Sequence, residues 1–357
     1  MRPAHNLSYP KTAMEYPFTE APSAGAVREV APGIYWVRMP LPFALEHINL
    51  WLLADNESWT IVDCGYAADD ARAAWEQIFA RHLGHRPVTR LIVTHSHPDH
   101  IGLCHWLSGK FALTPWITRS EYLLAHAYYH RIGGTGYAAL AALHARHGLA
   151  RDRLAAAGWR EDHYRRGVPQ LPDAFRSIGH GEAIEIGGNN WRVIVGRGHS
   201  PEHAALYCRK LGVLIAGDML LPRISTNVAV WPTEPEGDPL GEFLASLEQF
   251  RAIDAGALVL PSHGMPFRGM ASRIDELDRH HQVRLARLVE VCEQPMTAAE
   301  LLPHLFKRKF DDYQLVFAMG EAIAHLNYLM HRGALKRIHG RDGMYRFVRR
   351  GAAVAGT

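Results

Sequence analysis

A chain of 357 residues with 48% hydrophobic residues is long enough for one large domain and a smaller one, each with a buried core. Its formal net charge of +3 is too small to indicate a polyanionic partner by itself. The apolar stretches fall far short of the roughly 20 residues that cross a bilayer, and residues 1–24 lack the apolar segment of a secretory signal. We therefore expect a cytoplasmic protein with no membrane contact.

The cysteine and histidine content limits the chemistry further. Cys64, Cys104, Cys208 and Cys292 are far apart and form no Cys-x-x-Cys pair, which argues against a disulfide framework and against a cysteine-based zinc site. The chain also has 23 histidines. Their number alone identifies no ligand, so candidate sites have to be recognised by position.

After a proline-containing arm at 1–26, the first part of the chain has the pattern of a β-sheet. Runs rich in β-branched and aromatic residues predict strands at 33–38, 47–53, 59–63 and 91–94. A helix is predicted over 69–81, and another begins near His100. The strand at 91–94 leads directly into a cluster of polar side chains, so we expect it to deliver them to the rim of the sheet.

The middle of the chain changes from a helical to a β pattern. Residues 119–172 are rich in alanine and are broken by glycines, which predicts a mostly helical insertion. Strands are then predicted at 183–186, 191–195, 204–207, 213–216 and 257–260. Between the last two, Asp238-Pro239 has the pattern of an N-cap followed by the first helical residue, and it predicts a helix that runs to about Arg251.

The last part of the chain, 272–350, is predicted to be a separate winged-helix domain. A long helix is followed by Thr297-Ala-Ala-Glu300, the pattern of a capping box that opens a second helix. A third helix is expected over 314–331. The segments 334–338 and 344–348, separated by a glycine-containing turn, predict a small hairpin that would form the wing.

Four side chains that bind metals lie within six residues, as His95-x-His97-x-Asp99-His100. Imidazole and carboxylate ligands suit zinc, iron or manganese, and the absence of thiolates argues against a closed structural zinc site. In an extended turn His95 and His97 can face one point while Asp99 and His100 face another. The spacing therefore favours two adjacent metal ions over one.

Three later segments each place a further ligand at the end of a predicted strand. His199 follows the strand at 191–195, Asp218 follows the strand at 213–216, and His263 follows the strand at 257–260. A single loop histidine is usually a hydrogen-bonded surface residue. Three such positions together with the early cluster predict a dinuclear catalytic centre instead.

The ordered segments Thr94-His-Ser-His-Pro-Asp-His100, Gly198-His199, Gly217-Asp218 and His263-Gly264 resemble the motifs of the metallo-β-lactamase superfamily. The resemblance implies an αββα sandwich over 27–271 with a helical lid insertion at about 119–172. It also implies the ligand sets: His95, His97 and His199 for a first ion, Asp99, His100 and His263 for a second, and Asp218 between them.

The resemblance also gives roles to residues outside the ligand set and exposes two departures. Asp63 and His203 are expected to support the ligands from behind. Many relatives have Gly-Gly after the fourth ligand and a glycine before His203, where this chain has the run Ile101-Gly102-Leu103 and Glu202. These differences affect packing and ligand orientation, so they weaken an inference about the substrate more than one about the metals.

Two divalent ions imply a hydrolytic mechanism. The cofactors are expected to be two zinc ions, with iron or manganese as alternatives. They would share a water with a pKa lowered to about 7, and the resulting hydroxide would attack a carbonyl carbon or a phosphorus. Asp99 and Asp218 are the residues assigned catalytic roles, because Asp99 can orient the hydroxide and Asp218 sets the spacing of the ions.

The helical insertion is the candidate for substrate binding, with Tyr128, Tyr129, Arg131, Tyr164 and Arg165 as the proposed contacts. The insertion also contains other aromatic and basic residues, including Tyr122, His130, Tyr137, Trp159 and Arg166. This mixture suits a substrate with an apolar part and an anionic part. The alternative is that these aromatic residues only pack the insertion on the sandwich.

The C-terminal segment suggests a second type of partner. Between 331 and 350 seven basic residues face a single acid, Asp342. The basic residues are Arg332, Lys336, Arg337, Arg341, Arg346, Arg349 and Arg350. A basic wing can bind nucleic acid phosphates, although such a run is more often a solvated surface.

Three activities therefore remain open from the sequence. The segment around 320–336 resembles the C-terminal module of a superfamily branch with endoribonuclease-like and acyl-thioester-cleaving members. The first choice is hydrolysis of a thioester or carboxylic ester, on a small-molecule or acyl-carrier substrate such as an acyl-CoA. The second is cleavage of single-stranded RNA, and the third is persulfide dioxygenation with one iron, in which His100 and His263 would be idle. The N-terminal arm is a candidate for wrapping a second subunit in a homodimer.

Overall fold

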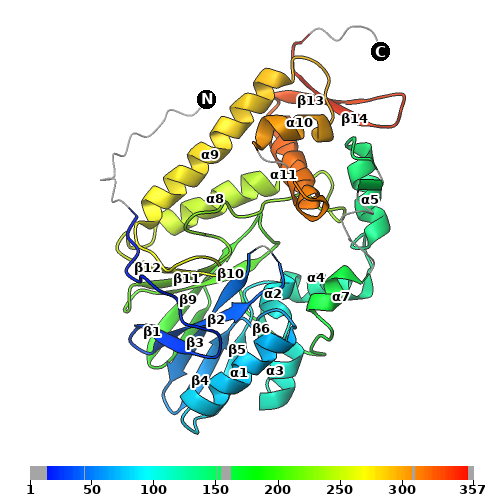
Figure 1. Ribbon diagram of the computed structural model, residues 1–357. Helices are drawn as coiled ribbons and strands as arrows, with labels where there is room; N and C mark the ends of the chain where they lie inside the picture. The colour runs from blue at the N-terminus through cyan, green and yellow to red at the C-terminus, as the bar shows by residue number, and fades with distance from the viewer. Residues whose placement is uncertain (1–13, 44, 151, 154–161, 308–309, 353–357) are drawn as a thin grey trace.

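The structure is a computed structural model that describes residues 14–43, 45–150, 152–153, 162–307 and 310–352 (Figure 1). Within this part of the chain the strands form two large sheets and one hairpin. The first sheet has the order β1 to β7, with bounds Val27–Ala31, Ile34–Pro40, His47–Asp55, Ser58–Val62, Val88–Ile92, Trp116–Ile117 and Arg176–Ser177. The second has the order β12-β11-β10-β9-β8, with bounds Leu258–Pro261, Val213–Gly217, His203–Cys208, Asn189–Gly196 and Ala183–Ile186.

The two sheets pack face to face because their strands alternate between two apolar faces. In β3, Trp51 and Leu53 lie in the core between the sheets, whereas Leu50 and Leu52 face the helices outside. The outer face of the first sheet is covered by α1 (Asp69–His82), α2 (Pro98–Ile101) and α3 (Cys104–Phe111). The second sheet is covered by α8 (Pro239–Arg251) and α9 (Met270–Val291), which completes four layers.

The elements predicted from the sequence are present, with differences at the edges of the first sheet. Strands β1, β6 and β7 were not predicted. In β1 the charged residues Arg28 and Glu29 obscure the apolar pattern, as is common in edge strands, and β6 and β7 have two residues each. Strand β5 ends at Ile92 rather than at residue 94, because Thr94 already turns to bond Asp63.

The insertion contains α4 (Arg119–His130), α5 (Tyr137–Arg146) and α7 (His163–Gly167) and leads from the sandwich toward the C-terminal helices (Figure 1). Its far end is attached there. The backbone N–H of Ala299 donates to the carbonyl of His147 over 3.0 Å, and the His147 ring lies 5.3 Å from the ring of Tyr345. Trp159, which was predicted to belong to the lid, lies outside the described residues.

The C-terminal part of the chain has the predicted helices and hairpin: α10 (Ala298–Leu305), α11 (Asp312–His331), β13 (Leu335–His339) and β14 (Tyr345–Arg349). The predicted capping box is confirmed, since Thr297 and Glu300 exchange side-chain and backbone hydrogen bonds. However, a boundary at 271 falls inside α9. The core of these elements continues without interruption into the outer face of the second sheet, where Phe243 and Leu247 pack. The C-terminal module therefore shares one hydrophobic core with the outer face of the sandwich.

The described part of the N-terminal arm packs on its own chain. Glu15 and Arg268 exchange two backbone hydrogen bonds of 3.2 and 2.8 Å, and the ring of Phe18 lies 6.3 Å from that of Trp36. Residues 14–24 thus have a place on their own chain, and the expected contact of the arm with a second subunit stays a prediction. Residues 1–13 lie outside the described part of the chain. No helix among the described residues is both long enough and apolar enough to cross a membrane.

Two buried histidines between α9 and α11 predict a loss of stability in acid. Nδ1 of His281 lies 3.1 Å from Nε2 of His325, and both side chains are fully buried. Burial lowers the pKa of His281 to about 2 and that of His325 to about 3. Below pH 6.5 the unfolded chain therefore binds protons that the folded chain does not, and each imidazole costs about 1.4 kcal/mol of stability per pH unit.

Replacing both residues by leucine is expected to make the loss in unfolding free energy between pH 7 and pH 5 smaller by about 4 kcal/mol. Urea unfolding of the wild type and of H281L/H325L at both pH values measures this difference. His304 is exposed, so H304Q serves as the control and should follow the wild type. Parallel losses in the wild type and the double variant would refute the prediction.

Candidate metal centre

The predicted ligands all lie at one edge of the sandwich, where strands end. His95, His97 and Asp99 follow β5, with His100 in the short helix α2. His199 lies in the loop between β9 and β10. Asp218 comes directly after β11, and His263 follows β12. Segments separated by more than a hundred residues thus meet at one place, as the sequence predicted.

The seven side chains form two groups, each able to hold one ion. The first comprises His95, His97, His199 and Asp218, and the second comprises Asp99, His100 and His263. In the first group Nε2 of His95 lies 2.9 Å from Nδ1 of His97 and 3.2 Å from Nε2 of His199. Nε2 of His199 lies 3.3 Å from Oδ2 of Asp218.

The second group touches the first through Asp218. Nε2 of His263 lies 3.4 Å from Oδ2 of Asp99 and 3.6 Å from Oδ1 of Asp218. Nε2 of His100 lies 3.6 Å from Oδ2 of Asp218. Both oxygens of Asp218 therefore face ligand atoms, and the side chain reaches both groups, which is the arrangement expected of a carboxylate between two ions.

The donor atoms fit divalent cations. Ligands about 2.0–2.1 Å from a tetrahedral zinc ion lie about 3.3 Å from one another, close to the 3.2 and 3.3 Å found in the first group. Nε2 of His100 and Oδ1 of Asp218 are buried and have no hydrogen-bond partner among the described residues. Such buried polar atoms are costly unless a ligand or ion satisfies them. The identity of the metal is not fixed by this donor set.

The histidine tautomers are set from outside the cluster. Nδ1 of His199 lies 2.8 Å from the carbonyl of Asn227, and Nδ1 of His263 lies 2.9 Å from the carbonyl of His47. These carbonyls accept only, so each Nδ1 carries a proton and each Nε2 is the ring nitrogen that faces the centre, where it would bind an ion when it carries no proton. The same reasoning applies to His100, whose Nδ1 lies 2.8 Å from Oδ2 of Asp63.

The charges of the two groups are unequal. Burial lowers the pKa of His95 well below its usual value, and it lowers that of His97 to about 3. Burial also opposes protonation of His100, but the carboxylates of Asp63, Asp218 and Asp99 outweigh it and raise its pKa well above the usual value. For Asp218, burial is outweighed by His263 and His100, which hold its pKa well below the usual range. The centre thus attracts positive charge.

Asp63 supports the ligand loop, as the resemblance implied. Its Oδ1 accepts from the backbone N–H of Thr94 over 2.7 Å, and its Oδ2 accepts from the Thr94 hydroxyl over 2.9 Å and faces His100. Asp63 has a φ of 65°, in the left-handed region that aspartate tolerates better than most residues. This conformation turns the carboxylate from the end of β4 toward the ligands.

Replacing Asp63 by asparagine is expected to weaken metal binding about 10- to 100-fold, the usual effect of removing a carboxylate behind a histidine ligand. The amide would keep the shape, but its nitrogen is a donor and would face either the backbone N–H of Thr94 or Nδ1 of His100. Competition with a chromophoric chelator measures the change in dissociation constant. An unchanged affinity in D63N would show that Asp63 only packs.

His203 also acts from behind the centre. Its Nε2 accepts from the backbone N–H of Asp218 over 3.1 Å, and burial lowers its pKa well below the usual value, which keeps the ring neutral. Gly217 has a φ of 55°, and a Cβ there would lie 2.2 Å from Nε2 of His203. Glycine is therefore required before Asp218, both for its conformation and for the approach of the histidine.

A cavity of about 520 Å³ opens onto the centre. His97, Asp99, His199, Asp218 and His263 line one part of it. The remaining walls come from the β2–β3 loop, the β4–α1 loop, the insertion, the 221–232 loop and α11. They include Phe43, Leu45, Tyr66, Tyr128, Arg131, Tyr137, Leu140, His163, Tyr164, Arg166, Leu221, Ile224, Trp231, Tyr313 and Phe317.

The structure separates the predicted substrate contacts into two sets. Tyr128, Arg131 and Tyr164 line the cavity, whereas Tyr129 and Arg165 do not. The Tyr129 hydroxyl donates to the carbonyl of Pro169, and Nε of Arg165 donates to the carbonyl of Tyr129 while its guanidinium lies over the Tyr129 ring. These two residues therefore stabilise the insertion itself, and their predicted contact with the substrate stays a prediction that the cavity lining does not support.

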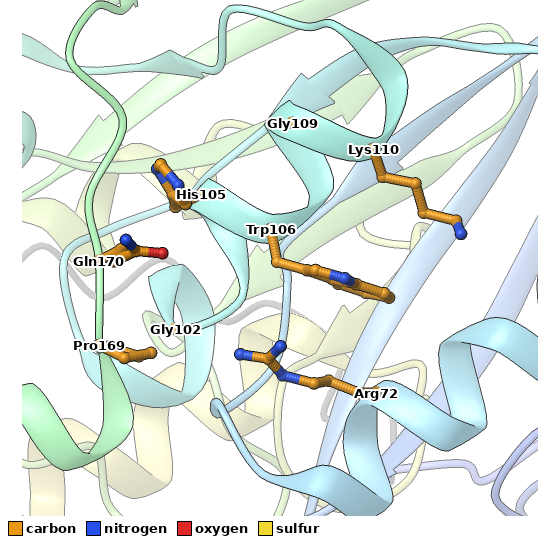
Figure 2. Close-up of a pocket in the computed structure, with 8 residues that line it drawn as sticks. All are labelled: Arg72, Gly102, His105, Trp106, Gly109, Lys110, Pro169 and Gln170. Atoms are coloured by element: carbon orange, nitrogen blue, oxygen red, sulfur yellow. The ribbon is translucent and has the colours of Figure 1, made fainter.

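A second cavity is lined by residues of α1, α3 and the segment after α7, and none of the seven predicted ligands is among them (Figure 2). Arg72, His105, Trp106 and Lys110 surround it, and the carboxylate of Glu76 binds Lys110 from the neighbouring helix. In its wall, Gly102 has no room for a side chain, because a Cβ would lie 2.4 Å from the carbonyl oxygens of Gly167 and Pro98. The departure from Gly-Gly thus leaves intact the glycine that packing requires.

Sequence reasoning missed residues that complete the site. Glu121 binds two of the ligand-bearing loops, and Asn49 holds the β12 end by donating to the carbonyls of Pro261 and Gly264. The cavity residues of the 221–232 loop and of α11, such as Trp231 and Phe317, were also missed. None of these residues belongs to a recognisable motif. The one signal in the sequence was Asn49, a polar residue at a position of its strand that alternation places in the core.

A four-layer sandwich with a histidine and aspartate cluster at its strand ends defines a class of metal-dependent hydrolases. The chain belongs to the metallo-beta-lactamase superfamily, whose family model matches residues 44–263. A second family model, described as the metallo-beta-lactamase-like C-terminal domain, matches residues 285–350. The protein is accordingly a hydrolase of this superfamily.

Similar proteins cover nearly the whole chain. A beta-lactamase domain protein from Burkholderia ambifaria is 46% identical, with a TM-score of 0.88 over 94% of this chain and 98% of its own. A metallo-beta-lactamase family protein from Thermus thermophilus is 34% identical, with a TM-score of 0.77 over 90% of this chain and 100% of its own. A Bacillus subtilis protein named "Probable metallo-hydrolase YqjP" is 24% identical over 82% of this chain and 91% of its own.

Proposed function

We propose that the protein hydrolyses a thioester or a related carboxylic ester, with an acyl-CoA-like conjugate as the favoured substrate. The observation that carries this proposal is the cavity at the centre. Its walls are largely aromatic and aliphatic, and two of the residues that line it, Ile224 and Leu45, are 46% and 38% exposed. Apolar walls of this kind favour a substrate with an apolar acyl group.

The chain contributes the positioning and the charge for this reaction. Two divalent ions bound by the seven ligands would supply an activated water and polarise the substrate carbonyl. Asp218 would hold the spacing of the ions, and the carboxylate of Asp99, which lines the cavity, would orient the attacking water. The raised pKa of Tyr66, caused mainly by burial, keeps its hydroxyl protonated as a hydrogen-bond donor in the cavity wall.

The cavity also has polar groups suited to an anionic part of the substrate. Arg131, His163 and Arg166 are among its lining residues. Arg166 is an exposed residue that already pairs with Asp162 over 3.1 Å, so its contribution to binding would be modest. A substrate with an apolar acyl group and an anionic carrier matches this distribution better than a purely apolar ester does.

Cleavage of single-stranded RNA is less well supported. Several of the basic residues that suggested phosphate binding are paired with acids of the same chain: Arg332 with Asp238, Arg337 with Glu236, Arg346 with Asp342, and Arg349 with Glu293. These pairs reduce the positive charge that the hairpin offers to a polyanion. Persulfide dioxygenation with one iron is also disfavoured, because His100 and His263 face the same cluster as the other ligands.

A substrate panel on the metal-loaded protein tests the proposal. Thiol release from acyl-CoAs of increasing chain length supports it, RNA cleavage or oxygen consumption with persulfide would replace it, and activity on none would refute it. The variant I224S should lower kcat/KM for long acyl groups about tenfold, from the loss of apolar contact. The matched control is V283S, since Val283 is an exposed residue of α9 away from the cavity.

A further inference from the structure

Glu121 is a fully buried carboxylate on α4 that joins two ligand-bearing loops. Its Oε2 accepts from the backbone N–H of Ser96 over 2.9 Å, and its Oε1 accepts from the backbone N–H of Glu202 over 2.8 Å. Ser96 lies between His95 and His97. Glu202 lies in the same loop as His199, between β9 and β10. One side chain therefore spans the segments that supply three ligands of the first group.

The environment of Glu121 is unusual for a buried acid. Among the described residues its hydrogen-bond donors are these two backbone amides, and no cation forms an ion pair with it. Burying a carboxylate is costly unless its oxygens are satisfied. Two neutral N–H groups therefore stabilise the buried Glu121 carboxylate, and an apolar or amide side chain at this position would avoid the cost of its burial. Fixing the two loops relative to each other offsets that cost.

Side chains of the insertion form hydrogen bonds with both backbone polar groups of Ser96. While its N–H donates to Glu121, its carbonyl accepts from the hydroxyl of Tyr164 over 2.7 Å. Tyr164 stacks on Tyr128 with ring centroids 5.3 Å apart, and both rings line the substrate cavity. The peptide groups between the two histidine ligands are thus oriented by the insertion as well as by the sandwich.

The N-terminal end of α4 adds a further contact to the second loop. The Thr118 hydroxyl donates to the carbonyl of Glu202 over 2.8 Å. Glu202 stands where many relatives have glycine, and its backbone is held at both its N–H and its carbonyl by the start of this helix. We infer that Glu121 is a positioning residue for the metal centre, and that together with Tyr164 it makes the insertion a support for the ligands in addition to a wall for the substrate.

The test is metal affinity, so it does not depend on which substrate the enzyme takes. In E121Q the amide oxygen can accept one N–H, but the amide nitrogen is a donor that faces the other. We expect the affinity for Zn²⁺, measured by competition with a chromophoric chelator, to fall about 10- to 100-fold. The matched control is E300Q: the carboxylate of Glu300 also accepts from a backbone N–H, that of Thr297, away from the centre.

A purely structural role predicts a different result. It would lower the melting temperatures of the metal-free and the zinc-loaded protein equally in E121Q and leave the zinc dissociation constant about the same as in the wild type. That outcome overturns the inference. Y164F removes the other hydrogen bond to Ser96 and decides the matter if E121Q does not fold: a loss of about threefold or more in zinc affinity, roughly the worth of one neutral hydrogen bond, supports the inference, and an unchanged affinity rejects it.

Discussion

Replacing Asp218 by asparagine is expected to lower kcat/KM at least about 1,000-fold, which corresponds to about 4 kcal/mol. The side chain lies 3.3 Å from His199 of the first group and 3.6 Å from His100 and His263 of the second. An amide is a weaker ligand, and its nitrogen would place a donor against these imidazoles. We therefore expect the variant to lose bound metal together with activity.

The control for D218N is D254N, the same change at an exposed aspartate away from the centre. Its activity and metal content should match those of the wild type. Both quantities are measured on the same preparations, by thiol release from the best acyl-CoA and by elemental analysis. Full turnover by D218N with a reduced metal content would refute the proposed roles of the cluster.

Removing the metal is expected to lower the unfolding free energy by about 4 kcal/mol for each ion, if each is present at about 1,000 times its dissociation constant. In the metal-free protein, the buried Asp218 and the partly buried Asp99 face the imidazoles of His100 and His263. Burial lowers the pKa of His263, but Asp218 and Asp99 outweigh it and raise the pKa, so the metal-free centre should gain stability as the pH falls toward the range where His263 and His100 protonate.

Thermal unfolding before and after chelation, at two pH values, measures both effects. The shift in melting temperature on adding Zn²⁺ back should be larger at about pH 8 than at about pH 6, because at the lower pH the ions must displace protons from the imidazoles. A shift that is absent, or one that is larger at the lower pH, would contradict this description of the cluster.

The sequence predicted the centre well because its ligands follow strand ends. A buried strand places the residue after it at the rim of a sheet, so the positions of His199, Asp218 and His263 could be inferred without knowing the pairing of the strands. The four-residue cluster at 95–100 supplied the starting point. The structure brings all seven residues into the two groups that the family resemblance implied.

The walls of the cavity could not be predicted in the same way. They depend on how the insertion, the 221–232 loop and α11 pack against one another, and a composition rich in aromatic residues does not say which rings face the substrate. Tyr129 and Tyr164 illustrate this, because both are tyrosines of the insertion and only Tyr164 lines the cavity. Glu121 gave no signal at all, since a single acid in an amphipathic helix normally faces solvent.

In the C-terminal module the local structure was predicted from the sequence, but its packing on the sandwich was not. The capping box, the helices and the hairpin follow from local patterns and are present as predicted. Whether their core is separate from that of the sandwich depends on long-range packing, which those patterns do not contain. In the structure Tyr313 and Phe317 of α11 line the cavity, so the module forms part of the proposed substrate site.

Metal stoichiometry combined with the distance between the ions tests the dinuclear centre most directly. Elemental analysis and X-ray absorption spectroscopy of the active protein should find two divalent ions per chain, about 3.5–4 Å apart, with imidazole and carboxylate ligands. A fully active protein that binds a single ion, or two ions too far apart for Asp218 to reach both, would contradict it.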